Sequence, residues 1–214
     1  MAPRGRFITF EGGEGTGKTT QVGRLAECLS QSGIECVVTR EPGGTDGAQA
    51  IRELVVSGAG DRWGPVSEAL LMYAARRDHV DRVIKPSLAS GKWVLCDRFS
   101  DSTLAYQGYA RGLGADWVRE LDRLSLNGFK PDLTLLLDLP VSEGLSRASA
   151  RGGPDRFELL GHEFHEDLRR AFLDIAATEP DRVVTLSAEG SVDSVAKRVK
   201  DAVQSRFALT GPAK

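Results

Sequence analysis

The chain has 214 residues, a length that suits one domain (residues 1–214) with an ample core. Its 28 Lys and Arg side chains nearly balance its 30 Asp and Glu side chains, so the formal net charge of −2 gives no reason to expect nucleic acid or a membrane surface as a partner. Its longest apolar runs are only a few residues long, so we expect no membrane span or signal peptide and predict a cytoplasmic protein.

The first predicted strand, residues 6–11, leads into a glycine-rich loop that fits the pattern G-x-x-x-x-G-K-[ST]. A predicted helix follows at residues 18–29. A glycine turn that binds nothing would not need Lys and Thr at its end, whereas a phosphate-binding loop needs the strand, the loop and the helix together. Lys18 is expected to reach the β- and γ-phosphates, and the Thr19 hydroxyl to bind Mg²⁺. The predicted ATP-binding residues are Gly12, Gly13, Glu14, Gly15, Thr16, Gly17, Lys18, Thr19 and Thr20.

Strand and helix patterns alternate along the rest of the chain. Short apolar runs such as residues 93–96 are typical of strands buried on both faces of a parallel sheet. The three cysteines have no paired or metal-like spacing and are expected to be free thiols. We predict an α/β fold of the P-loop NTPase class, with a five-stranded parallel sheet and helices on both faces. The predicted strands are residues 6–11, 35–39, 93–96, 133–138 and 183–186, and the predicted helices are residues 18–29, 46–56, 67–90 (bent near Pro86), 116–126, 141–150, 158–177 and 192–203.

Charged pairs follow the second and third predicted strands, at the edge of the sheet where parallel strands end and ligands bind. Arg40 could grip a phosphate with its guanidinium fork, or it could form a structural ion pair in a solvent-facing turn. Arg98 is expected to converge on the same place. The neighbouring Asp97 could hold Mg²⁺ through water, orient Thr19, or simply neutralise Arg98.

Three arginines, Arg147, Arg151 and Arg156, surround a Gly-Gly-Pro break in the helical pattern. We predict a mobile lid at about residues 147–158 that closes over the ligands and brings arginine to a transferring phosphoryl group. Closure would also exclude water, which would otherwise hydrolyse the nucleotide. The alternative is an exposed basic helix end.

Residues 10–20 (FEGGEGTGKTT), 40–45 (REPGGT) and 97–108 (DRFSDSTLAYQG) together resemble the bacterial thymidylate kinases, and the likeness runs from about Phe7 to the last predicted helix. The first motif is general among P-loop proteins, and the other two are much more specific. The resemblance implies a nucleoside monophosphate kinase-like fold and transfer of the γ-phosphoryl group of Mg-ATP to dTMP, in dTTP biosynthesis. It also implies a homodimer packed through helices, for which residues 67–90 are a candidate face.

The resemblance also implies roles at matching positions. Arg40 and Arg98 look like the clamp on the acceptor phosphate, and Arg76 is similar to the thymine-reading arginine. Met72 stands where an aromatic residue often stacks on the base, and Tyr73 could share that role. Arg52 resembles a further phosphate contact, Thr103 and Gln107 match residues at the base edge, and Tyr106 matches one near the sugar. The implied substrate-binding set is Arg40, Glu41, Pro42, Arg52, Met72, Tyr73, Arg76, Arg98, Thr103, Tyr106 and Gln107.

Glu14 in the loop, together with arginines in the predicted lid, resembles the lid-arginine type of the family. The expected catalytic residues are Lys18, Arg98, Arg147, Arg151 and Arg156, and the expected metal-binding residues are Thr19 and Asp97.

Other functions of the same loop make different demands on the sequence. A GTPase switch needs a guanine-reading N-K-x-D segment, and the single asparagine of the chain, Asn127, does not fit one. A nucleoside kinase needs a general base for a neutral hydroxyl, whereas this chain offers arginines for an anionic acceptor. A kinase for another nucleoside monophosphate and a structural ATP-binding protein stay open at this point.

Overall fold

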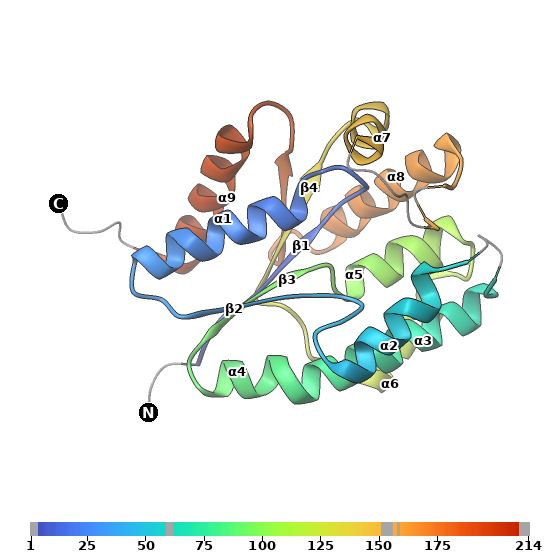
Figure 1. Cartoon of the computed structure of the whole chain (residues 1–214), viewed down its shortest axis with the longest axis horizontal. Coiled ribbons are helices and arrows are strands. Elements are labelled where there is room, and N and C mark those ends of the chain that lie inside the picture. Colours follow the sequence, from blue (N-terminus) through green and yellow to red (C-terminus); the bar gives the residue numbers. More distant parts are fainter. Residues whose placement is uncertain (1–3, 59–61, 151–155, 158, 210–214) are drawn as a thin grey trace.

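Five parallel strands form the centre of the part of the molecule that the computed structural model describes, which comprises residues 4–58, 62–150, 156–157 and 159–209 (Figure 1). The predicted parallel sheet is therefore confirmed, and each predicted strand lies within a residue or two of its observed position. The strands are β1 (Phe7–Glu11), β2 (Cys36–Arg40), β3 (Trp93–Asp97), β4 (Leu133–Asp138) and β5 (Val183–Ser187), in the order β2-β3-β1-β4-β5.

Two helices, α1 (Lys18–Gln31) and α9 (Val192–Phe207), pack against each other and cover one face of the sheet (Figure 1). Their apolar side chains form one buried cluster with those of the strands, which includes Leu25 of α1, Val199 of α9 and Phe10 of β1. Because the strands are apolar on this face and on the other, burial on both sides is their stable state.

The opposite face of the sheet is covered by a second apolar cluster, in which Phe7 and Val94 of the strands meet Ile84 and Phe172 of the helices. Helix α2 (Asp46–Val56) packs on α3 at the outside of this layer, and α7 (Val141–Ser149) lies beside α8. The elements of this layer are α3 (Pro65–His79), η1 (Val80–Ile84), α4 (Lys85–Ala89), α5 (Ser100–Thr103), η2 (Leu104–Ala110), α6 (Ala115–Leu126) and α8 (His162–Thr178).

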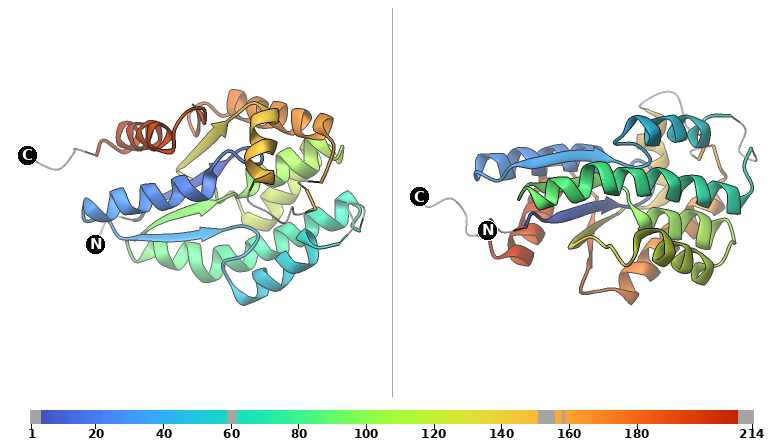
Figure 2. Two further views of the ribbon diagram at one scale, coloured as in Figure 1. Left: turned by 45° about the horizontal axis from the view of Figure 1, so that its top comes forward. Right: turned by 90° about the horizontal axis from the view of Figure 1, so that it is seen from below.

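The long helix predicted at residues 67–90 exists, but it contains a wider π turn at Val80–Ile84 in place of a bend at Pro86. Proline has no N–H to donate to the carbonyl four residues earlier, and its ring presses on that carbonyl. The π turn directly before Pro86 gives that position room, so the helical rod continues along the sheet as α3, η1 and α4 (Figure 2). The helix predicted at residues 158–177 begins later, at His162.

All five strands point the same way, so their C-terminal ends lie at one edge of the sheet. The glycine-rich loop follows β1, Glu41 follows β2, and Arg98 follows β3 at this edge.

Within the described ranges, every helix is too short or too polar to cross a membrane.

Candidate active site

The backbone of the glycine-rich loop packs closely against neighbouring backbone at Gly12 and Gly15. Both have positive φ angles, 135° and 69°. A Cβ atom would lie 2.3 Å from the Leu137 carbonyl oxygen at Gly12 and 1.9 Å from the Gly144 carbonyl oxygen at Gly15, so only glycine fits. The loop therefore has the fixed backbone path that inward-pointing N–H groups require.

Lys18 reaches back over this loop. Its ammonium group donates hydrogen bonds to the carbonyl oxygens of Gly12 at 3.1 Å and Gly13 at 2.8 Å. Burial, and then the neighbouring Arg98, lower the pKa of Lys18 to about 8. A partly desolvated cation at the start of a helix is the arrangement that binds phosphate.

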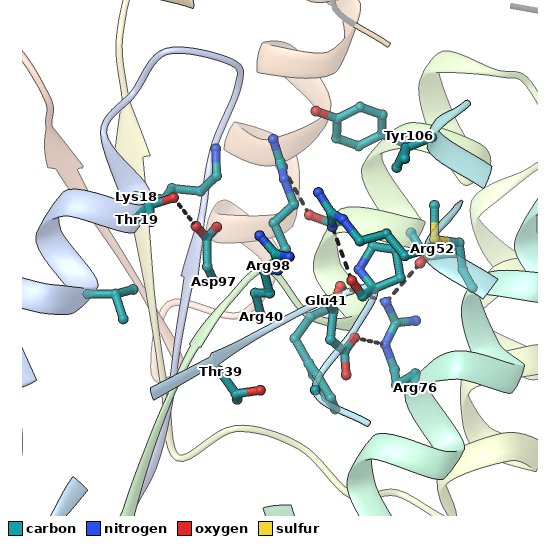
Figure 3. Close-up of a pocket in the computed structure, with 18 of the residues that line it drawn as sticks. Lys18, Thr19, Thr39, Arg40, Glu41, Arg52, Arg76, Asp97, Arg98 and Tyr106 are labelled. Carbon is teal, nitrogen blue, oxygen red and sulfur yellow. Dashed lines mark hydrogen bonds and ion pairs between the residues drawn. The ribbon is translucent and has the colours of Figure 1, made fainter. Parts of the chain in front are cut away.

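Thr19 and Asp97 connect the start of α1 to the end of β3. The Thr19 hydroxyl donates to Oδ2 of Asp97 at 2.5 Å (Figure 3). One hydroxyl and one carboxylate beside a phosphate site suit Mg²⁺, which is commonly held by one or two protein ligands together with phosphate oxygens and water. In the described residues there is no cluster of three or more His, Cys, Asp or Glu side chains that would form an all-protein site.

Arg98 occupies the middle of the site, with Lys18 and Thr19 on one side and Arg76 on the other in Figure 3. Its backbone is left-handed, with φ at 69°. Its guanidinium donates to the Gly12 carbonyl oxygen at 3.0 Å and to Oε1 of Glu14 at 2.8 Å. Burial opposes the charge of Glu14, but Arg98 and Lys18 outweigh it and lower the pKa of Glu14 to about 2. The Tyr106 hydroxyl donates to the same carboxylate at 2.5 Å.

Glu11, the last residue of β1, holds the turn that carries Arg98. Its carboxylate accepts hydrogen bonds from the Phe99 N–H at 2.7 Å, the Ser102 N–H at 3.2 Å and the Ser102 hydroxyl at 2.6 Å. Burial, and then the charge of Asp101, raise the pKa of Glu11 to about 7. The sequence prediction did not include Glu11 in the site, although a carboxylate in a strand with no exposed face was a signal.

Arg76 lies at the far end of the site and is held on three sides. Its Nε donates to Glu41 at 2.6 Å, and its Nη2 donates to the Phe99 carbonyl oxygen and to the Thr103 hydroxyl, both at 3.0 Å. Its Nη1 is buried and finds no acceptor among the described residues. Glu41 is also bound by Nδ1 of the buried His79 at 2.9 Å. His79 was not predicted, but Met72, Arg76 and His79 share one helix face by their spacing.

One cavity of about 620 Å³ connects the phosphate loop to Arg76. It brings together Glu14, Gly15, Gly17, Lys18, Thr19 and Asp97 with every predicted substrate-binding residue except Tyr73. Three of the other loop residues, Gly12, Gly13 and Thr16, line a much smaller space behind the loop, and Thr20 is exposed on α1. The two predicted sets thus share one space, in which two ligands could meet.

Tyr73 is the predicted substrate-binding residue that does not line the cavity. Its ring lies 4.7 Å from the Arg76 guanidinium, and its hydroxyl donates to Asp122 at 2.9 Å, away from the cavity. Met72 lines the cavity instead. Neighbouring residues of a helix point about 100° apart, which places Met72 and Tyr73 in different surroundings here.

Arg156, a predicted lid arginine, does not line the cavity either. It is 3% exposed, its Nε donates to the Val55 carbonyl oxygen at 3.0 Å, and its Nη2 pairs with Glu68. Val55 of α2 and Glu68 of α3 therefore hold this guanidinium. Arg147 pairs with Glu143 at 2.5 Å and donates to the Ala188 carbonyl oxygen at 3.2 Å. Arg151 lies outside the described residues.

Comparisons with known proteins agree on one family. The model of the family "Thymidylate kinase" matches residues 10–199. The chain is 56% identical over 206 residues to a thymidylate kinase of Caulobacter vibrioides, covering 96% of this chain and 99% of that protein. It is 53% identical over 207 residues to one of Bradyrhizobium sp. strain ORS 278, covering 95% and 92%. A crystal structure of thymidylate kinase from Ehrlichia chaffeensis superposes with a TM-score of 0.78 at 35% identity, covering 94% of this chain and all of that one.

Proposed function

The chain belongs to the thymidylate kinase family, and we propose that its cavity holds ATP and dTMP end to end, with the phosphates meeting beside Arg98. It is an ATP-dependent nucleoside monophosphate kinase that transfers the γ-phosphoryl group of ATP to dTMP. The observation that supports the placement is one cavity that is lined by both Lys18 and Arg76, whose buried Nη1 finds no acceptor among the described residues.

At the donor end, the loop N–H groups and Lys18 bind the ATP phosphates. Thr19 and Asp97, already joined at 2.5 Å, would hold Mg²⁺, which when bound neutralises phosphate charge. Glu41, Arg40 and Arg52 line the cavity beyond them. Arg52 donates to the Pro42 carbonyl oxygen at 3.1 Å. We place the acceptor phosphate among Arg40, Arg52 and Arg98, which all line the cavity.

Phosphoryl transfer depends on position and charge stabilisation. Lys18 and Arg98 both donate to the Gly12 carbonyl oxygen, so the two cations converge beside the proposed meeting point of the nucleotides and stabilise the charge of the transferring group. Arg147 on α7 is a further candidate, and Arg151 stays a prediction of the resemblance. Arg156 is left out of this set because its guanidinium is buried against Glu68.

At the acceptor end, Nη1 of Arg76 is a buried donor that a base carbonyl oxygen would satisfy. Met72 lies on the cavity wall and covers the base, since its flexible thioether adapts to a flat ring. Thr103 and Gln107 lie at the base edge, and Tyr106 with Glu14 lies toward the sugar.

We also propose a cytoplasmic homodimer. Cys28, Cys36 and Cys96 are free thiols, as a reducing compartment allows. Large apolar side chains are exposed on α3 and α6, namely Val66, Leu70, Trp117 and Leu124, and pairing this face with a second copy would remove it from water.

A coupled assay of ADP production with a panel of nucleoside monophosphates tests the reaction. We expect dTMP to exceed the other monophosphates at least tenfold in kcat/KM. Lys18→Ala and Arg98→Ala should each lower kcat by about two orders of magnitude, because each removes a main charge stabiliser worth about 3 kcal/mol. A higher rate with another monophosphate, or near-normal rates in either variant with an intact circular dichroism spectrum, would contradict the proposal.

A further inference from the structure

Glu68 of α3 is a fully buried carboxylate behind the acceptor end of the cavity. Its Oε2 pairs with Nη2 of Arg156 and lies 3.8 Å from Nη2 of Arg111. Two positively charged guanidinium groups thus face this buried carboxylate. An ionised carboxylate can only accept hydrogen bonds.

This charge fixes the orientation of Gln107. Nε2 of Gln107 donates to Oε1 of Glu68 at 2.7 Å. An amide can usually turn over and exchange its donor and acceptor ends, but here only the NH₂ end can face the carboxylate. The amide oxygen must therefore point elsewhere. Gln107 lines the cavity, and no group of the described residues donates to its oxygen.

The acceptor end of the cavity thus offers two complementary groups. Both Gln107 and Arg76 line the cavity; among the described residues, no group donates to the amide oxygen of Gln107 and none accepts from the buried Nη1 of Arg76. Thymine has a carbonyl oxygen at position 4 beside an N–H at position 3, so it matches an Arg donor and a Gln acceptor. Cytosine has an amino group at position 4 and an acceptor nitrogen at position 3, so both contacts would be mismatched.

We propose that Glu68 is a specificity-determining positioning residue, which makes the site select a pyrimidine with an N3–H donor over cytosine by fixing the amide of Gln107. Arg156 supports this role from outside the cavity, because it neutralises Glu68 and is itself held by the Val55 carbonyl oxygen. The inference rests on the dTMP site proposed above, and it gives Arg156 a role without contact to either nucleotide.

The test compares kcat/KM for dTMP and for dCMP, with ATP saturating. Glu68→Gln keeps the size of the side chain, but its amide can donate as well as accept, so Gln107 becomes free to turn over. We expect the dTMP-to-dCMP ratio to fall at least tenfold in this variant. A purely structural role would lower both values together and leave the ratio unchanged.

Four further variants separate the possible causes. Gln107→Leu should lower the same ratio, and the double variant Glu68→Gln/Gln107→Leu should lower it no further, because Glu68 acts through Gln107. Glu68→Gln/Arg156→Met also removes the buried guanidinium that faces Glu68, so it should regain thermal stability relative to Glu68→Gln while the ratio stays low. Glu120→Gln, an exposed change on α6, should leave the ratio at the wild-type value.

A folded Glu68→Gln or Glu68→Gln/Arg156→Met variant that keeps the wild-type ratio within twofold would overturn the inference. A wild-type protein that does not prefer dTMP would instead contradict the proposed function itself, so the two failures are distinguishable.

Discussion

Lys18 shows how burial prepares a residue for its ligand. Before a nucleotide binds, burial and Arg98 hold its pKa at about 8, below the usual value of 10.5. A triphosphate brings negative charge to the ammonium group and raises this pKa again. Nucleotide binding should therefore take up a proton at Lys18 near and above pH 8.

We expect ATP affinity to fall as the pH rises above about 8, by up to tenfold per pH unit, because the free lysine must first be protonated. Isothermal titration calorimetry at pH 8.5, in two buffers with different ionisation enthalpies, measures the proton uptake directly. The uptake should disappear in Lys18→Met. Equal heats in both buffers for the wild-type protein would show that Lys18 is already fully charged.

The pKa of Glu11 is shifted in the opposite direction to that of Lys18: it is raised from 4.5 to about 7. The folded state then binds a proton that the unfolded state has released, so this carboxyl contributes stability below pH 4.5 that is lost as the pH rises to 7. The loss amounts to about 3 kcal/mol. Glu11→Gln cannot ionise, so its stability relative to the wild type should increase between pH 5 and pH 8. Urea denaturation at both pH values measures this difference, and a constant difference would contradict the raised pKa.

Residue by residue, the sequence predicted the ligands of the phosphate end better than their supports. Lys18 and Thr19 belong to one short motif, so spacing alone identified them. The partners of Glu11, Glu68 and His79 lie 35 or more residues away in the chain, and only the fold brings them together. The same distance explains why Arg156 was assigned to a phosphate when it pairs with Glu68.

At the scale of elements, α3 contributes side chains to two different environments. Met72 and Arg76 face the cavity, whereas Tyr73 faces α6, where its hydroxyl meets Asp122. The periodicity of residues 67–90 predicted a helix correctly, but an apolar stripe does not say which of two adjacent residues faces a ligand. The π turn before Pro86 could not be predicted either, since it depends on how the rod lies against the sheet.

Tyr73→Phe separates these two environments. The change removes only the hydrogen bond to Asp122, so we expect it to lower the free energy of unfolding by about 1 kcal/mol and to leave KM for dTMP within twofold. Arg76→Lys should raise that KM at least tenfold, because lysine cannot replace the guanidinium contacts to Glu41 and Thr103. Chemical denaturation and steady-state kinetics measure the two effects. A large rise in KM for Tyr73→Phe would return Tyr73 to the base site.

At the scale of the whole molecule, the parallel sheet brings all the motifs to one edge. Right-handed crossovers are general to such sheets, which is why residues 12–19, 40–41 and 97–98 could be placed together before the structure was known. The sheet does not determine what lies outside it. The exposed apolar side chains of α3 and α6 follow from the packing of the helical layer, and the sequence could not separate this face from a core face.

Leu70 tests the proposed dimer, because it lies near the middle of α3 and half of its surface is exposed, 50% in the single chain. A charge at this position would be buried without a partner in a dimer that uses this face, at a cost of several kcal/mol for two copies. We expect the wild-type protein to have the mass of a dimer by sedimentation velocity and Leu70→Glu to have that of a monomer, with an unchanged circular dichroism spectrum. Leu173→Glu, an exposed leucine of α8 outside this face, is the matched control and should stay dimeric. A Leu70→Glu protein that remains a dimer would place the interface elsewhere on the molecule.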